Sequence, residues 1–254
     1  MNKIKRIVAL ALALAATCAA AGAAGGEGKA FGPSDVMRCG GQNIMVCRGA
    51  DVYAALGAPQ SRTHLGYEGA TGHGFVDWAY PGLVIRLVAG YDSPYFEWET
   101  DLATLPFDEP FLKVRSVAVD RAGIIGPRDI QVGMPMDGVL ALFPPPMQPG
   151  HPPYEHAFDG DVMLYAYGGA GIDDPYGTYS PYPPYGMICQ GGGDDGYDYA
   201  LLCNYIDPSF YEEEVLAHGG DPSSYVYHSQ YRFSVFFAGG EATGFTLYYG
   251  ATSE

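Results

Sequence analysis

The sequence predicts an α+β protein in which short helical elements pack on antiparallel strands. The first observation is an internal repeat. The segment Val132–Pro146 has an earlier counterpart in Val46–Pro59, and each copy ends at a proline, which a helix does not continue through. The second observation is that both copies are followed by runs of alternating apolar and polar residues, which indicate half-buried strands. We therefore expect two tandem repeats, each with a short helix on an antiparallel sheet.

The chain begins with a segment typical of a secretory signal peptide. Lys3, Lys5 and Arg6 precede an unbroken apolar run, and small residues with Ala-x-Ala cleavage sites follow. We expect residues 1–24 to be removed, which makes the mature protein secreted or extracytoplasmic. Cys18 supports a second interpretation, a lipid-anchored cysteine, although Thr17 just before it departs from the usual lipoprotein box.

The mature chain is strongly acidic. The formal charge of the whole sequence is −16, and loss of the three basic residues of the signal peptide brings it to −19. Such a chain repels phosphate backbones and anionic lipid, so nucleic-acid and membrane-surface binding are not expected. No later stretch reaches the roughly 20 apolar residues of a transmembrane helix. The charge serves solubility, or it steers a partner with a basic or mixed surface.

Both copies of the repeat predict one or two helical turns. Asp51 and Asp137 lie near the two starts, where an acid is favourable. Apolar residues recur at i, i+3 and i+4 on one side of each helix, and these residues are Val52, Ala55 and Leu56 in the first copy and Val139, Leu142 and Phe143 in the second.

The first repeat, residues 25–128, contains three predicted strands. Phe75–Tyr80 and Leu83–Val88 flank a Pro-Gly turn, and Lys113–Val119 alternates between apolar and polar residues. The polar residues 60–74 are expected to form a loop.

A second loop is expected over residues 89–110. It contains six acids and no bases, with aromatic residues between them. Tyr95 and Trp98 in this loop are candidate binding residues.

The second repeat, residues 129–254, contains longer connections rich in Tyr, Pro and Gly. Its predicted strands are Asp161–Tyr167, a hairpin of Met187–Gln190 with Tyr199–Ile206, and a hairpin of Tyr231–Phe237 with Ala242–Tyr249 around Gly239-Gly240.

Thirteen of the 21 tyrosines lie between residues 176 and 249. Tyrosine combines a large contact area with a polar tip, which favours it at interfaces, but it is also a common strand residue. We expect the strand tyrosines to cover the core. The loop tyrosines are candidate binding residues, with loop packing as the alternative: Tyr176, Tyr179, Tyr182 and Tyr185.

Four cysteines remain in the mature chain, which is an even set in an exported protein. Local pairing predicts one disulfide in each repeat, Cys39 with Cys47 and Cys189 with Cys203. Zinc is the alternative, but neither pair has Cys-x-x-Cys spacing.

Nothing in the sequence indicates an enzyme, a cofactor or a metal centre. No nucleophile motif occurs, and the prolines between His151 and His156 prevent the helical register of a two-histidine metal site. Calcium is left open at two acidic loops, although neither follows the EF-hand pattern: Asp159 with Asp161, and Asp194 with Asp195 and Asp198.

The repeat resembles the β-lactamase-inhibitor-protein fold, which is shared with small outer-membrane assembly lipoproteins. Residues 133–139, Gly-Met-Pro-Met-Asp-Gly-Val, match the Gly-Met-x-x-x-x-Val helix start of that fold, and a proline stop follows at 144–146. The first copy keeps Val52, Leu56, Gly57 and Pro59 but lacks the Gly-Met pair. The resemblance implies one curved sheet with a concave binding face. It implies no target, because no inhibitory contact residues can be matched.

The sequence therefore predicts an exported, non-enzymatic binding protein that uses a tyrosine-rich sheet face and loops to hold a protein partner, with inhibition as one form of that binding. Two other classes stay open, which are a structural lipoprotein of the cell envelope and a carbohydrate-binding module whose tyrosines stack on sugar rings.

Overall fold

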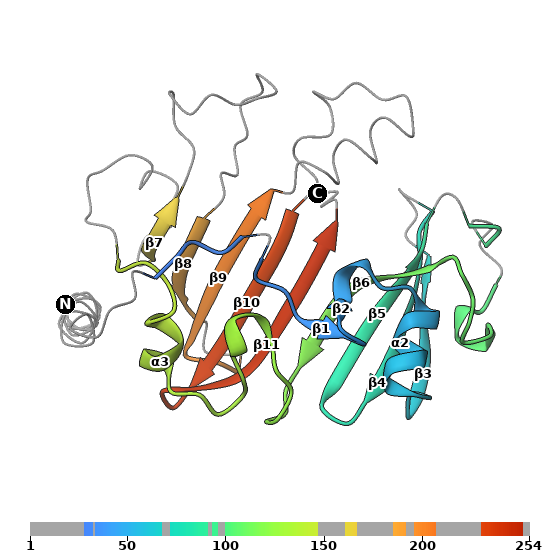
Figure 1. Cartoon of the computed structure of the whole chain (residues 1–254), viewed down its shortest axis with the longest axis horizontal. Coiled ribbons are helices and arrows are strands. Elements are labelled where there is room, and N and C mark those ends of the chain that lie inside the picture. The colour runs from blue at the N-terminus through green and yellow to red at the C-terminus, as the bar shows by residue number, and fades with distance from the viewer. Residues whose placement is uncertain are drawn as a thin grey trace, which may run out of the picture. The chain divides into compact units, whose positions relative to one another are not determined.

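The computed structural model describes residues 28–32, 34–67, 72–90, 93–95, 100–146, 161–166, 185–191, 196–206 and 230–250. Within these ranges antiparallel strands predominate and two short α-helices accompany them, so the predicted α+β class is confirmed (Figure 1). None of the helices in these ranges has the length and apolar character needed to cross a bilayer. The predicted signal peptide and Cys18 lie outside the described residues.

The chain divides into two units. The first-half unit comprises Asp35–Val132 and Gly244–Tyr249, and the second-half unit comprises Gly133–Thr243 with the chain ends Met1–Ser34 and Gly250–Glu254. The repeats predicted a boundary at residue 128. The observed units depart from this prediction mainly because most of the last strand belongs to the first-half unit and the N-terminal segment belongs to the second-half unit. The cause is tertiary contact, because the last strand, Glu241–Gly250, pairs with the strand Leu112–Val119 of the first half.

In the described residues, the first-half unit contributes five strands to the large sheet, in the order β3-β4-β5-β6-β11 with antiparallel pairings, and β1 pairs with β2 in a separate two-stranded sheet. Its elements are β1 (Arg38–Cys39), β2 (Gln42–Asn43), η1 (Ile44–Val46), α2 (Gly49–Leu56), β3 (Ser61–Tyr67), β4 (Gly74–Tyr80), β5 (Leu83–Ala89), η2 (Leu102–Thr104), β6 (Leu112–Val119), η3 (Pro127–Asp129) and the greater part of β11 (Glu241–Gly250).

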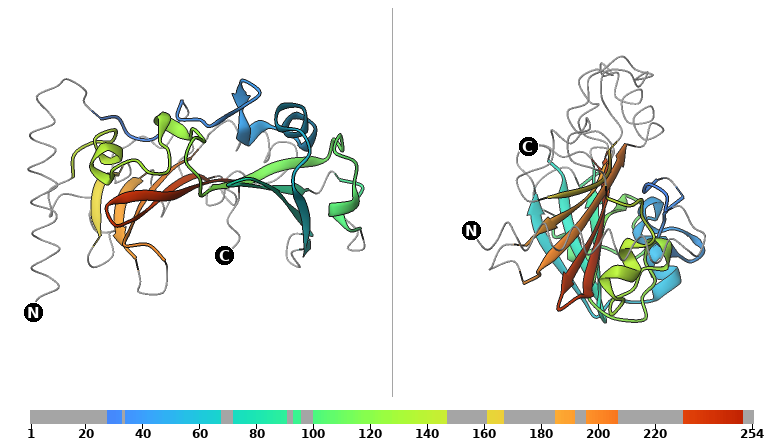
Figure 2. Two further views of the ribbon diagram at one scale, coloured as in Figure 1. Left: turned by 90° about the horizontal axis from the view of Figure 1, so that it is seen from below. Right: turned by 90° about the vertical axis from the view of Figure 1, so that its left-hand side faces the viewer.

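One face of these strands forms the core of the first-half unit. Alternate residues along the strands are buried, including Val76, Trp78, Ile85, Leu87, Leu112, Val117, Phe245 and Leu247. The helix α2 lies over this face (Figure 2). It comes close because it begins at a glycine: a Cβ on Gly49 would lie 3.2 Å from Cη2 of Trp78. The predicted helix at Asp51 is confirmed, and the Asp51 carboxylate accepts the backbone N–H of Arg48 at 2.8 Å.

The loop predicted over residues 60–74 is wrong in its first part. β3 occupies Ser61–Tyr67 and pairs with β4, with Thr63 opposite Asp77. It is an edge strand, and its residues alternate only between exposed and half-buried. Because an edge strand has a neighbour on one side alone, it buries little, and its polar sequence hides the strand period.

The second-half unit carries four further strands in the order β10-β9-β8-β7, with antiparallel pairings. Its elements are α3 (Met136–Leu140), β7 (Val162–Ala166), β8 (Tyr185–Gln190), β9 (Tyr199–Ile206), β10 (Gln230–Ala238) and the first residues of β11. The turn between β10 and β11 is the predicted Gly239-Gly240, and both glycines have positive φ, 60° and 85°. That conformation suits a two-residue hairpin turn.

The N-terminal segment packs into the second-half unit through Phe31. Its ring stacks on Phe233 and Tyr231, with centroid distances of 5.3 and 5.6 Å. Its backbone N–H donates to the hydroxyl of Tyr165 at 3.1 Å. α3 is tied to the β10–β11 turn, because the N–H of Met136 donates to the carbonyl of Gly240 at 2.9 Å.

Candidate functional site

One face of the sheet in the first-half unit carries half-buried and exposed side chains. Strand pairing places Asp77, Arg86, Ser116 and Tyr248 in one row across four strands, on the side opposite the buried core residues. A second row on the same side contains Ala79, Val84, Ala118 and Thr246. We call this surface the open face, and its residues are Phe75, Asp77, Ala79, Val84, Arg86, Val88, Lys113, Arg115, Ser116, Ala118, Thr246 and Tyr248.

The open face exists because the helical elements of this unit pack on the other side. Among the described residues, η1 and α2 contact the sheet through the buried side chains. The core residues there are nearly all below one-tenth exposed, whereas Val84 is 37% exposed. The sequence implies this asymmetry, since the two faces of each strand differ in polarity.

Two arginines are held in fixed positions on the open face. Arg86 makes a two-pronged contact with Asp77, Nε to Oδ1 at 2.8 Å and Nη2 to Oδ2 at 3.0 Å. The hydrogen bond to Asp77 raises the pKa of Arg86 above its ordinary value. The guanidinium of Arg115 lies 4.9 Å from the centroid of the Tyr248 ring and donates to its hydroxyl at 2.9 Å. Planar guanidinium groups held in this way are suited to recognising carboxylates.

The charge of the open face differs from that of the chain. Three bases, Arg86, Lys113 and Arg115, and one acid, Asp77, occupy it, while the whole chain carries −16. Beside them, the row of Ala79, Val84 and Ala118 presents small apolar side chains. The open face therefore combines a basic part with a flat apolar strip.

Sequence reasoning did not identify these residues. Part of the signal was present, because Arg86 alternates with buried residues along its strand. Arg115 was not signalled, because strict alternation would place it with the buried Val117, and a register shift beside it brings it to the open face. Tyr248 was assigned to core cover as a strand tyrosine. Its place beside Arg115 depends on the pairing of β11 with β6, which spans more than half of the chain.

Tyr95 is the one candidate binding tyrosine whose side chain the structure describes. Its hydroxyl donates to Oε2 of Glu109 at 2.8 Å, and Oε1 of Glu109 accepts the N–H of Phe111 at 3.3 Å. The hydrogen bond to Glu109, with a smaller effect of burial, raises the pKa of Tyr95. Tyr95 therefore braces its own loop against the segment that leads into β6.

The remaining predicted binding residues are not brought together by the described structure. Trp98, Tyr176, Tyr179 and Tyr182 lie outside the described residues, as do His151, His156, Asp159, Asp194 and Asp195. Tyr185 begins β8, where its backbone pairs with Asn204.

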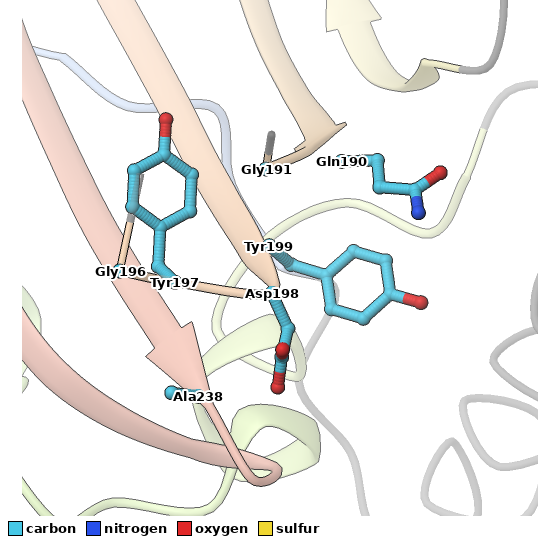
Figure 3. A pocket seen from close by; sticks show the side chains of 7 residues that line it. All are labelled: Gln190, Gly191, Gly196, Tyr197, Asp198, Tyr199 and Ala238. Atoms are coloured by element: carbon cyan, nitrogen blue, oxygen red, sulfur yellow. The ribbon is translucent and has the colours of Figure 1, made fainter. Parts of the chain in front are cut away.

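A separate pocket lies in the second-half unit, at the end of the β8–β9–β10 strands (Figure 3). Its volume is about 520 Å³, and its lining residues are Gln190, Gly191, Gly196, Tyr197, Asp198, Tyr199 and Ala238. Tyr197 packs on Phe236 with a centroid distance of 5.1 Å. Sequence reasoning weighed Asp198 only as a calcium ligand. No cluster of three or more potential metal ligands occurs among the described residues.

The four cysteines are thiols in the structure. Cys39 and Cys47 lie close enough for each thiol to affect the pKa of the other, and the Cys47 thiol donates to the carbonyl of Asn43 at 3.4 Å. Burial, and then the charges of Cys39 and Asp51, raise the pKa of Cys47 to about 11. This proximity is compatible with the predicted Cys39–Cys47 bridge, which stays a prediction.

The predicted Cys189–Cys203 bridge does not agree with the strand register. On β8 and β9, Cys189 pairs with Ala200 and Cys203 with Gly186. The two cysteines are offset by three residues, about 10 Å along the strand, and such an odd offset points their side chains to opposite faces. A disulfide requires Cα atoms within about 7 Å. The local-pairing argument failed because closeness in the sequence does not specify the register.

We expect oxidation to join Cys39 to Cys47 and to stabilise the protein by about 2.5 kcal/mol through closure of this short loop. Peptide mapping without reductant should recover this pair and no Cys189–Cys203 pair. In the reduced protein, the raised pKa of Cys47 means that the folded thiol keeps its proton after the unfolded thiol has lost it. Stability should therefore fall as pH rises from about 9 to about 11.

The oxidised protein serves as the control for that pH dependence, since a bridged Cys47 has no proton to lose. Equal alkaline slopes for the reduced and oxidised forms would contradict the assignment to Cys47. Recovery of Cys39 and Cys47 in disulfides to other cysteines, and not to each other, would contradict the bridge.

Comparison with known proteins adds no relative. No protein-family model matches the chain, and neither a curated protein nor a solved structure matches it.

Proposed function

We propose that this protein is an exported, non-enzymatic binding protein that holds a protein partner on the open face of its first-half unit. The observation that carries the proposal is a sheet face on which small apolar residues lie beside fixed guanidinium groups. Small-molecule sites are concave, whereas this surface is a broad row of strand positions. Mixed apolar and charged composition with an aromatic residue and arginine is typical of non-obligate protein interfaces.

The overall charge of the chain led to the expectation of a partner with a basic or mixed surface, but the charge of the open face favours one with an acidic or mixed surface. Asp77 already occupies the two-pronged edge of Arg86, so Arg115 and the exposed Lys113 supply the positive charge that a carboxylate of the partner would meet. The overall acidity of the chain then acts against partners that are acidic throughout. A partner that presents a local acidic patch satisfies both conditions. Charge of this kind raises the association rate and the specificity more than the affinity.

The tandem-repeat interpretation belongs to the same proposal. In the part of each unit that the structure describes, one short α-helix, α2 or α3, is followed along the chain by antiparallel strands. The supporting sequence match is strongest at the start of α3, in residues 133–139. In this interpretation the first repeat supplies most of the interaction surface, the last strand of the second repeat adds Thr246 and Tyr248, and the second repeat has diverged in its connections.

A site-specific photocrosslinker tests the proposal. With benzoylphenylalanine at Val84, irradiation of the mature protein in culture medium or envelope extract should give one discrete covalent adduct. The matched controls are Val46 and Ile125, which are also apolar and are 67% and 54% exposed, but lie outside the open face. They should give no such adduct.

Adducts of equal yield at all three positions would indicate nonspecific contact and would contradict the proposal. A discrete adduct at Val46 or Ile125 and none at Val84 would move the interface to the helical side of the unit.

A further inference from the structure

The pocket at the end of β8, β9 and β10 is built from rigidly held residues. Asp198 is attached at three points: its N–H donates to the carbonyl of Phe237 at 2.7 Å, its carbonyl accepts from Gly191 at 2.9 Å, and its Oδ2 accepts from the N–H of Gly239 at 2.8 Å. Tyr199 pairs with Gln190 across the two strands. The polar groups around the pocket are therefore positioned before any ligand arrives, which reduces the entropy lost on binding.

Three polar groups of this pocket have unused hydrogen-bonding capacity. In the described part of the chain, the side-chain amide of Gln190, the hydroxyl of Tyr199 and Oδ1 of Asp198 make no hydrogen bond. Figure 3 shows the Gln190 amide and the Tyr199 ring on the same side of the pocket, with the Asp198 carboxylate beside them. Together they offer a carboxylate acceptor, an amide that donates and accepts, and a phenol that does both.

The combination of an aromatic ring with such groups has a specific chemical counterpart. A pyranose ring has an apolar face of C–H groups and a rim of hydroxyls, each of which donates and accepts a hydrogen bond. A tyrosine ring packs on the C–H face, and carboxylate and amide groups satisfy the hydroxyls. The negative charge of Asp198 disfavours an anionic ligand, since like charges repel.

We propose that this pocket binds a neutral hexose unit of a glycan, with the sugar ring on Tyr199 and its hydroxyls on Asp198 and Gln190. The volume of about 520 Å³ is large enough for one or two sugar units and too small for a protein domain. The site shares no residue with the open face, so the assignment of a sugar ligand does not rest on the proposed protein partner.

Titration of the mature protein followed by NMR tests the proposal. The probes are the methyl glycosides of glucose, galactose, mannose and N-acetylglucosamine, with methyl glucuronide as the anionic counterpart. At least one neutral probe should shift the resonances of Gln190, Asp198 and Tyr199, and the glucuronide should bind more weakly.

Replacing Tyr199 with alanine should weaken the affinity by about tenfold, because the stacking surface is lost. Tyr199→Phe keeps the ring and should lose about threefold or less, and Gln190→Ala should lose about fivefold. Tyr248→Ala, an aromatic change on the open face, is the matched control and should leave the sugar affinity unchanged.

Chemical-shift changes in the wild-type protein do not depend on the folding of any variant, so they test the sugar site even if Tyr199→Ala is unstable. Absence of shifts at the pocket with every probe would overturn the sugar site. Equal affinity of Tyr199→Ala and the wild type would do the same. Binding of the glucuronide as tightly as the neutral probes would overturn the assignment of a neutral ligand.

Discussion

Replacing Trp78 with alanine is expected to lower the free energy of unfolding by about 4 kcal/mol. The Trp78 side chain is completely buried, lies under Gly49 of α2 and meets the Phe107 ring edge-on at 5.5 Å. Phe107 in turn stacks on Tyr53 at 4.5 Å and lies beneath the guanidinium of Arg62 at 4.4 Å. Truncation therefore leaves a cavity at the contact between helix, sheet and the residue 100–111 segment. Urea denaturation followed by circular dichroism measures the loss.

Trp78→Phe is the matched variant, because the indole N–H has no hydrogen-bond partner among the described residues. Phenylalanine fills most of the space and removes a buried donor that costs free energy when unsatisfied. We expect this variant to lose about 1 kcal/mol or less. A loss as large as that of Trp78→Ala would show that the indole N–H makes a stabilising interaction and would contradict the cavity explanation.

The second large effect is expected at Arg128, where substitution with alanine should destabilise the protein by about 3 kcal/mol. Its Nε and Nη2 atoms donate to the two carboxylate oxygens of Asp35 at 2.9 and 2.7 Å. The side chains are only 10% and 14% exposed, so loss of the arginine leaves the Asp35 carboxylate largely buried without its principal partner. Arg128 and Asp129 also have φ of 57° and 59°, a backbone conformation that non-glycine residues rarely adopt.

The Asp77–Arg86 pair provides the control for this prediction. Its geometry is also two-pronged, but the Arg86 side chain is 44% exposed. Arg86→Ala should therefore cost less than about 1 kcal/mol, since water screens the exposed pair. Similar losses for Arg128→Ala and Arg86→Ala would show that burial does not determine the strength of these pairs.

The binding residues predicted from composition include no residue of the open face or of the pocket. Tyr95 and Trp98 were chosen because aromatic and acidic residues alternate in their loop. Such a loop has two physical outcomes: its aromatic rings bind a partner, or they hold the loop in place. The Tyr95–Glu109 hydrogen bond shows the second outcome for Tyr95, and only the geometry distinguishes the two.

The strands that alternate strongly could be predicted from the sequence alone. Phe75–Tyr80, Leu83–Val88 and Lys113–Val119 correspond to β4, β5 and β6 within one residue at each end. The hairpin turn at Gly239-Gly240 was also predicted, because two adjacent glycines between strands favour positive φ. The α+β class follows from these local patterns, since a half-buried strand needs apolar residues at every second position.

Only the tertiary structure decided which distant residues meet. β11 pairs with β6, so Arg115 lies beside Tyr248, 133 residues away in the chain, and Asp35 holds Arg128 across 93 residues. The register of β8 and β9 likewise separates Cys189 from Cys203, which sequence proximity had joined. Local sequence determines the conformation of a segment through its own periodicity. The register and the pairing of strands depend on the packing of the whole core, and the open face and the pocket are consequences of that packing.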